Sequence, residues 1–253
     1  MQKIVLMIQL NPLIVILQLA KVLTFVGVHG DDFFAQGITF KNVAGPLKHQ
    51  AVALTSEAER SAFYKCSFVG FQDTLYAKRG IQFFRECEIY GTVDFIFGKA
   101  SVVFQNCIIY ARTPLPGQSN TITAQGRGVQ QRDDGTVIHN CTITATEDLR
   151  QQSSKVKTYL GRPWGTYSRT VIIQSFLDNI IDPHGWLNWT GHRLDRPYYA
   201  EFDNRGPGAS TNARVKWALV IDRATAAEYS VRNFIQGYEW IPAIGIPVHL
   251  DLL

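Results

Sequence analysis

The chain has 253 residues, of which 46% are hydrophobic and 18% are charged, so it carries too much apolar material to be a disordered chain. Lys and Arg number 25 and Asp and Glu number 21, which gives a formal net charge of +4. This small excess suits a polyanionic partner, but no run of Lys and Arg indicates nucleic-acid binding. At this length we expect one or two domains.

The first 28 residues are apolar but interrupted by polar residues and a proline. The interruptions leave fewer than the ~18 clean apolar residues that a membrane span needs. Two interpretations stay open. One is a signal peptide with Lys3 in its charged region, and the other is two or three short buried strands bounded by the turn signal Asn11-Pro12.

One pattern recurs along the chain, in which apolar residues alternate around a small or polar pair. Its copies are residues 38–43, 63–68, 84–89, 103–109, 137–143 and 171–177. Aligned on positions 42, 66, 87, 107, 141 and 175, they are separated by 24, 21, 20, 34 and 34 residues. Repeats of this size indicate a solenoid, and their β-branched and aromatic content predicts coils made of strands. The sequence therefore predicts an all-β parallel β-helix, in which the two long steps carry inserted loops of about ten residues.

All four cysteines occupy the same phase of this repeat: Cys66, Cys87, Cys107 and Cys141. One small buried side chain in each coil is what packing alone favours. No C-x-x-C pair indicates a zinc or redox site, and the spacing leaves any disulfide pairing open.

Helical spacing appears near the end of the chain, over residues 224–235. We expect this segment to pack on the side of the solenoid, with Trp240 as an anchor.

Several polar residues fall in register once the period is known. Gln50, Gln72 and Asp94 follow one another at steps of 22, and Asp73 lies 21 before Asp94. One coil corresponds to ~4.8 Å in space, so Asp73 and Asp94 should lie side by side, with the two glutamines stacked beneath Asp94. Arg162 lies 68 residues after Asp94, which equals two 34-residue steps, and its long side chain spans most of the ~10 Å between them. Adjacent strand residues point to opposite faces, so Gln72 and Asp73 share a site only near a bend or bulge.

Paired carboxylates with amide donors beside them suggest acyl transfer. Two close carboxylates do not both ionise easily, and Arg162 favours the ionised form of Asp94. Asp94 is then the nucleophile and Asp73 the general acid/base, while the glutamine amides hold a developing oxyanion. The alternative is a polar ladder that only satisfies coil edges and turns. No Gly-x-Ser-x-Gly or His-Glu-x-x-His motif occurs, and the six histidines show no metal-ligand spacing.

Aromatic residues accompany this column. Tyr76 follows Asp73 by three residues and Phe97 follows Asp94 by three, so the two rings are also one coil apart. Trp164, Trp186 and Trp189 lie further along the chain. Aromatic faces suit stacking on sugar rings, so we expect Tyr76, Phe97, Trp164 and Trp186 to contact substrate, although packing under a loop is the commoner fate of a single Trp.

Several segments resemble the signature segments of plant pectin methylesterases, in the same order, from about residue 30 to the C-terminus. They are residues 44–50, 50–54, 72–76, 91–98, 123–127, 160–164, 167–170 and 198–201. The resemblance implies a right-handed parallel β-helix that hydrolyses methyl esters of galacturonate in pectin, releasing methanol and pectate. It also implies no metal or organic cofactor, a secreted monomer of the cell wall, and a proteinaceous pectinesterase inhibitor as a partner. Nucleic acids and membranes are not expected as partners.

The resemblance also implies roles for individual residues. The aspartate of Gln72–Tyr76, Asp73, is the acid/base, and the aspartate of Gly91–Gly98, Asp94, is the nucleophile. Gln50 and Gln72 belong to the oxyanion hole, Arg162 orients Asp94, and Trp164 contacts the sugar.

This chain departs from the family pattern in three respects. The family's catalytic domain starts earlier, so we assign residues 1–29 as a divergent apolar segment and 30–253 as the pectinesterase-like β-helix. Thr55 and Ile81 stand where the family usually has Arg, and Lys99 stands where it has Asn. Two further hypotheses remain: a galacturonan glycosidase on the same scaffold, which also uses paired aspartates, and a pectin-binding remnant with little or no activity.

Overall fold

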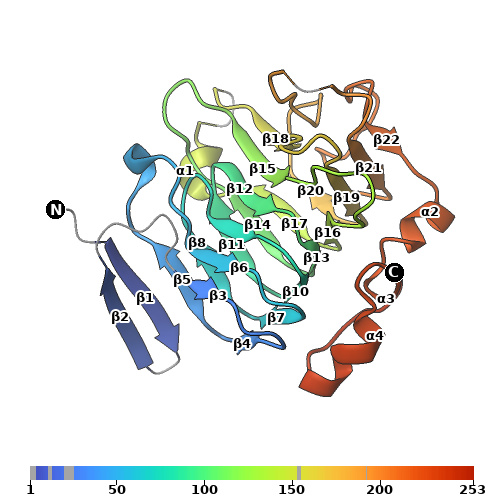
Figure 1. Cartoon of the computed structure of the whole chain (residues 1–253). Coiled ribbons are helices and arrows are strands. Elements are labelled where there is room, and N and C mark those ends of the chain that lie inside the picture. The colour runs from blue at the N-terminus through green and yellow to red at the C-terminus, as the bar shows by residue number, and fades with distance from the viewer. Residues whose placement is uncertain (1–3, 11–12, 20–25, 153–154, 192) are drawn as a thin grey trace.

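The computed structural model describes residues 4–10, 13–19, 26–152, 155–191 and 193–253, and its strands wind into a solenoid (Figure 1). Three sheets run along the solenoid, and each full coil contributes one strand to each sheet. Neighbouring coils pair in parallel and in register, so the predicted parallel β-helix is confirmed.

The strands of the three sheets have the following bounds. The first sheet contains, in spatial order, β2 (Leu13–Leu19), β1 (Ile4–Leu10), β5 (Thr39–Asn42), β8 (Ser67–Val69), β11 (Glu88–Gly91), β14 (Ile108–Ala111), β17 (Thr142–Ala145) and β20 (Phe176–Leu177). The second contains β22 (Leu219–Val220), β21 (Tyr198–Phe202), β19 (Arg169–Ile173), β16 (Gly135–His139), β13 (Ser101–Gln105), β10 (Ile81–Arg85), β7 (Ser61–Tyr64) and β4 (Phe34–Gln36). The third, called the site sheet below, contains β18 (Thr158–Gly161), β15 (Asn120–Gln125), β12 (Val93–Gly98), β9 (Leu75–Ala77), β6 (Leu54–Ser56) and β3 (Gly27–Val28).

A sharp corner joins the second sheet to the first in successive coils. The corner residue is Gly37 in the first coil, with φ 67°, and in the next five coils it has a φ between 50° and 55°: Lys65, Glu86, Asn106, Asn140 and Gln174. A left-handed residue turns the chain abruptly, and the cysteine or serine that follows each of these five points into the core. The repeated sequence pattern is therefore a strand, a corner and a second strand.

Stacked side chains fill the interior of the solenoid. The Phe63 and Phe84 rings lie 4.7 Å apart, and the Phe84 and Phe104 rings are also 4.7 Å apart. The four cysteines are buried in the same core and their thiols are free. Because each coil contributes equivalent apolar residues, the core continues along the solenoid axis.

Loops account for the longer steps in the repeat. Residues 112–119 join β14 to β15, residues 126–134 join β15 to β16, and residues 146–157 join β17 to β18. The last of these contains α1 (Glu147–Arg150). The expected loop insertions are thus confirmed, and they flank the site sheet. A short 3₁₀ helix, Pro46–Lys48, precedes β6.

The apolar N-terminal segment forms strands. β1 and β2 pair with each other, and β1 also pairs antiparallel with β5 at one end of the first sheet (Figure 1). This agrees with the interpretation as short strands, whereas the Asn11-Pro12 turn lies outside the described residues. β3 already pairs in parallel with β6, so the solenoid begins before the predicted boundary at residue 30.

The C-terminal segment packs against the second sheet, but as separate helices. They are α2 (Arg223–Ala227), α3 (Val231–Ile235), α4 (Gly237–Trp240) and a 3₁₀ helix, Pro242–Ile244. The predicted continuous helix over 224–235 is interrupted because Ser230 caps α3 by accepting from the Asn233 N–H. Val231 and Ile235 are fully buried on the sheet, whereas Trp240 is only partly buried. None of the helices in the described residues is long and apolar enough to cross a bilayer.

Candidate active site

Both aspartates of the predicted column stand at distortions of the site sheet. Asp73 has φ 61° and Asp94 has φ 51°, and the pairing of β12 with β15 shifts register between Val93 and Ile96. Aspartate tolerates the left-handed region better than most residues. These distortions supply the bend required for Gln72 and Asp73 to share a site, because strict strand alternation is lost there.

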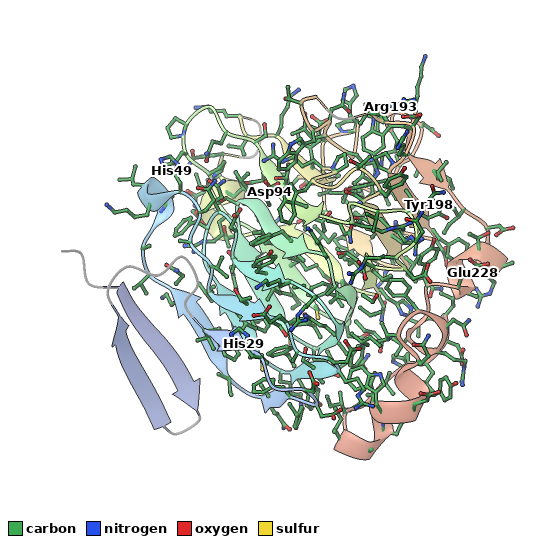
Figure 2. All side chains as sticks on the ribbon, in the orientation of Figure 1. His29, His49, Asp94, Arg193, Tyr198 and Glu228 are labelled. Atoms are coloured by element: carbon green, nitrogen blue, oxygen red, sulfur yellow. The ribbon has the colours of Figure 1, made fainter. Side chains whose placement is uncertain are left out.

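Asp94 lies on β12 and is only 6% exposed (Figure 2). Arg162 donates from Nε to Oδ1 at 2.8 Å and from Nη2 to Oδ2 at 2.6 Å. The Thr121 hydroxyl donates to Oδ1 at 2.7 Å and accepts from the Asp94 N–H at 2.9 Å. A bidentate guanidinium with a third donor holds this buried carboxylate in one orientation.

Asp73 is the carboxyl that keeps its proton more readily. Burial and the negative charge of Asp94 raise the pKa of Asp73 from 3.8 to about 7, although Arg162 opposes the rise. The Asp73 N–H donates to the Val93 carbonyl at 3.0 Å, so the two aspartates follow each other on adjacent coils. The structure therefore brings together one carboxylate held by an arginine and one carboxyl that titrates near neutrality.

The two glutamines occupy the preceding positions of the column. Gln72 is half-buried and Gln50 is exposed, and the Ala51 N–H donates to the Gln72 carbonyl at 3.1 Å across the coils. Within the part of the chain that the structure describes, neither side-chain amide has a hydrogen-bond partner. Both amides are thus available as donors to a bound group.

Three aromatic rings follow one another beside the carboxyl groups. Tyr76 and Phe97 stack with centroids 4.4 Å apart and planes 8° apart, as expected from their one-coil separation. Phe97 meets Trp164 edge-on at 6.1 Å. All three residues are half-buried, so each leaves part of its surface exposed to solvent. The ammonium of Lys99 lies 5.7 Å from the centre of the Trp164 ring.

Trp186 does not belong to this group, so its predicted sugar contact is wrong. It is 1% exposed, packs edge-on against Tyr199 at 4.8 Å, and donates from its indole N–H to Glu201 at 3.3 Å. A ring enclosed in this way cannot reach a substrate. Trp189, three residues later, instead lies 4.4 Å from the Arg162 guanidinium.

Thr121 is a site residue that the sequence analysis missed. It pairs with Asp94 across β12 and β15. The segment between these strands in the sequence includes the loop of residues 112–119, whose length the repeat does not predict. The residue follows Asp94 by 27 positions, which matches none of the repeat steps. Only the alternation within β15, where Thr121 and Thr123 share a face, could have suggested it.

Among the described residues, no three His, Cys, Asp or Glu side chains gather as a metal site would require. The arrangement holds a fixed carboxylate, a proton-bearing carboxyl and free amide donors beside an aromatic wall. These groups suit nucleophilic attack on a carbonyl.

The fold and the site define a parallel β-helix protein with a paired-aspartate centre on one sheet. The family model described as Pectinesterase matches residues 19–238, and the chain belongs to that family. Pectinesterase 2 of Citrus sinensis is 54% identical over 226 residues, which cover 88% of this chain and 44% of that protein. A probable pectinesterase/pectinesterase inhibitor 25 of Arabidopsis thaliana is 52% identical, over 89% of this chain and 37% of that protein. The chain thus spans less than half the length of these curated relatives.

The structure of a pectin methylesterase from carrot superimposes with a TM-score of 0.88 at 47% identity. The match covers 90% of this chain and 72% of the carrot chain. The right-handed parallel β-helix shared with that structure therefore includes nearly the whole chain.

Proposed function

We propose that the chain hydrolyses methyl esters of galacturonate residues in pectin, with Asp94 as nucleophile and Asp73 as general acid/base. The observation that carries the proposal is the bidentate Arg162–Asp94 pair beside a carboxyl with a pKa of about 7. The family and the names of its relatives support the ester and the polymer as substrate.

The hydrogen bonds favour one oxygen of Asp94 for the attack. Among the described residues, Oδ1 accepts from both Thr121 and Arg162, whereas Oδ2 accepts only from Arg162. Each carboxylate oxygen has about two lone-pair sites, so Oδ2 retains one for the ester carbonyl carbon.

The reaction then proceeds in two halves. Oδ2 bonds to the carbonyl carbon, and the amides of Gln50 and Gln72 donate to the resulting oxyanion. The carbonyl re-forms as the C–O bond to the methoxy group breaks, and Asp73 gives its proton to that group, which leaves as methanol. Water then attacks the Asp94-bound acyl carbon while the Asp73 carboxylate takes one proton from that water. The bond between this carbon and Oδ2 breaks, which frees the Asp94 carboxylate, and the galacturonic acid loses its remaining proton to solvent and leaves as galacturonate.

The remaining expectations from the resemblance belong to the same proposal. We infer that the chain acts outside the cell on wall polymer, as a monomer, through residues 30–253 as its catalytic domain. A proteinaceous inhibitor is a partner that the double name of the Arabidopsis relative supports. The aromatic wall of Tyr76, Phe97 and Trp164 is the proposed surface for the sugar rings.

The test is methanol release from methyl-esterified pectin by the wild-type chain and by Asp94→Ala. We expect release by the wild type and loss of at least about 10³-fold in the variant, because no other group forms the acyl intermediate. Asp133→Asn is the matched control, since the Asp133 side chain is 98% exposed. Equal activity of Asp94→Ala would refute the assignment, and new reducing ends from pectate would identify a glycosidase instead.

A further inference from the structure

A hollow of about 540 Å³ lies outside the proposed active site. It opens where the second sheet meets the turn that follows β18, and Tyr198, labelled in Figure 2, is on its wall. Its lining contains three arginines and three tyrosines: Arg127, Arg169, Arg196, Tyr167, Tyr198 and Tyr229. Three cations in one small hollow need an explanation, because like charges repel one another.

Arg127 is the most enclosed of the three cations. It is 6% exposed, and it donates from Nε to the Val129 carbonyl at 3.1 Å and from Nη2 to the Gln130 carbonyl at 2.8 Å. No carboxylate in the described part of the chain makes an ion pair with it. Burial, followed by the charge of Arg169, lowers the pKa of Arg127, and the more distant charges of Asp133 and Asp134 oppose this shift without contacting the guanidinium.

The other two arginines are also poorly neutralised. Arg169 lies 3.8 Å from the exposed carboxylate of Asp133, and its buried Nε has no hydrogen-bond partner among the described residues. Arg196 donates to the Tyr167 hydroxyl at 2.6 Å and lies over that ring at 5.3 Å. The one acid of the lining, Asp195, is already paired at 2.7 Å with Arg193, which does not line the hollow.

The hollow and the proposed active site are joined by one short stretch of backbone. The Trp164 N–H donates to the Gln125 carbonyl at 3.2 Å, and the Tyr167 N–H donates to the Arg127 carbonyl at 2.9 Å. Trp164 faces the site and Tyr167 faces the hollow, and three residues span at most about 11 Å. A sugar polymer that contacts Trp164 can therefore reach the hollow with a nearby unit.

We propose that this hollow binds a de-esterified galacturonate residue of the pectin chain, with its carboxylate on the arginines and its ring against the tyrosines. The proposal rests on the proposed function for the identity of the polymer. Guanidinium groups pair with carboxylates through two hydrogen bonds, and tyrosine faces suit sugar rings. A methyl ester lacks the negative charge, so the hollow selects units that have already lost their methyl group.

The experiment measures binding by calorimetry, with unesterified trigalacturonate, its trimethyl ester and inorganic phosphate as probes. The variants are Arg196→Gln, which removes an exposed cation of the lining, and Arg193→Gln, which removes an exposed cation of the same loop outside the lining. We expect trigalacturonate to bind the wild type, with about 10-fold or greater loss in Arg196→Gln and no change in Arg193→Gln. Arg169→Gln is a second variant with the same expected loss.

Three results would overturn the proposal: equal affinity of the wild type and both lining variants, equal affinity for the trimethyl ester, or displacement of trigalacturonate by equimolar phosphate. Methanol release from fully esterified pectin should be the same in Arg196→Gln and the wild type. If no methanol is released by any of these proteins, the proposed function fails, and the calorimetry still decides whether the hollow binds a uronate.

Discussion

Replacing Asp73 by Asn tests the electrostatic environment at the centre of the site. In the folded protein the pKa of Asp73 is about 7, whereas the ordinary value that applies to the unfolded chain is 3.8. Between these values the folded state holds a proton that the unfolded state has released, so the free energy of unfolding of the wild type falls as pH rises through this window. At 1.36 kcal/mol for each pH unit, the loss is about 4 kcal/mol by pH 8.

Asn carries no charge at any of these pH values, so Asp73→Asn should escape this loss. We expect the variant and the wild type to differ little near pH 4, and the variant to gain relative stability of about 4 kcal/mol by pH 8. Urea unfolding at intervals from pH 4 to pH 8 measures the difference, with the exposed Asp133→Asn as a control that should run parallel to the wild type. A constant difference between Asp73→Asn and the wild type across this range would refute the reasoning.

Four further substitutions separate chemistry from packing. Arg162→Lys breaks the bidentate contact with Asp94 and should reduce methanol release by about 10- to 100-fold, with protein of unchanged fold in circular dichroism; full activity would contradict the role of the paired hydrogen bonds. Thr121→Val removes the hydroxyl that donates to Asp94 and leaves a buried N–H unpaired, so we expect a stability loss of about 1–3 kcal/mol in urea together with slower release. Trp186→Phe should lose about 1–3 kcal/mol of stability but keep the activity of its folded fraction, whereas Trp164→Ala should lose activity with little change in stability; the reverse pattern would restore Trp186 to the site.

The sequence period correctly predicted which residues lie next to each other on adjacent, uninterrupted coils. Asp73 and Asp94 were placed together by a step of 21, and Tyr76 and Phe97 by the same step. No loop interrupts these coils, so sequence distance converts directly into distance along the solenoid. Five of the left-handed corners were also visible in the sequence, because each of these is followed by a Cys or Ser at the same position of the repeat.

Residues beyond a loop could not be placed in this way. Thr121 follows a loop whose length the repeat does not determine, so its position beside Asp94 depended on the folded chain. Trp186 and Trp189 lie outside regular strands, where no alternation indicates which ring faces inward. The break between α2 and α3 has a local cause, since Ser230 followed three residues later by Asn233 provides a cap, a signal that the apolar spacing of residues 224–235 concealed.

The four buried thiols can report when each coil of the solenoid opens. Cys66, Cys87, Cys107 and Cys141 sit on successive coils and are sealed from solvent, and burial raises the pKa of Cys87 and Cys141. An alkylating reagent therefore has to wait until a coil opens before it can mark the cysteine of that coil. The order in which the four cysteines are labelled would show from which end the solenoid unfolds.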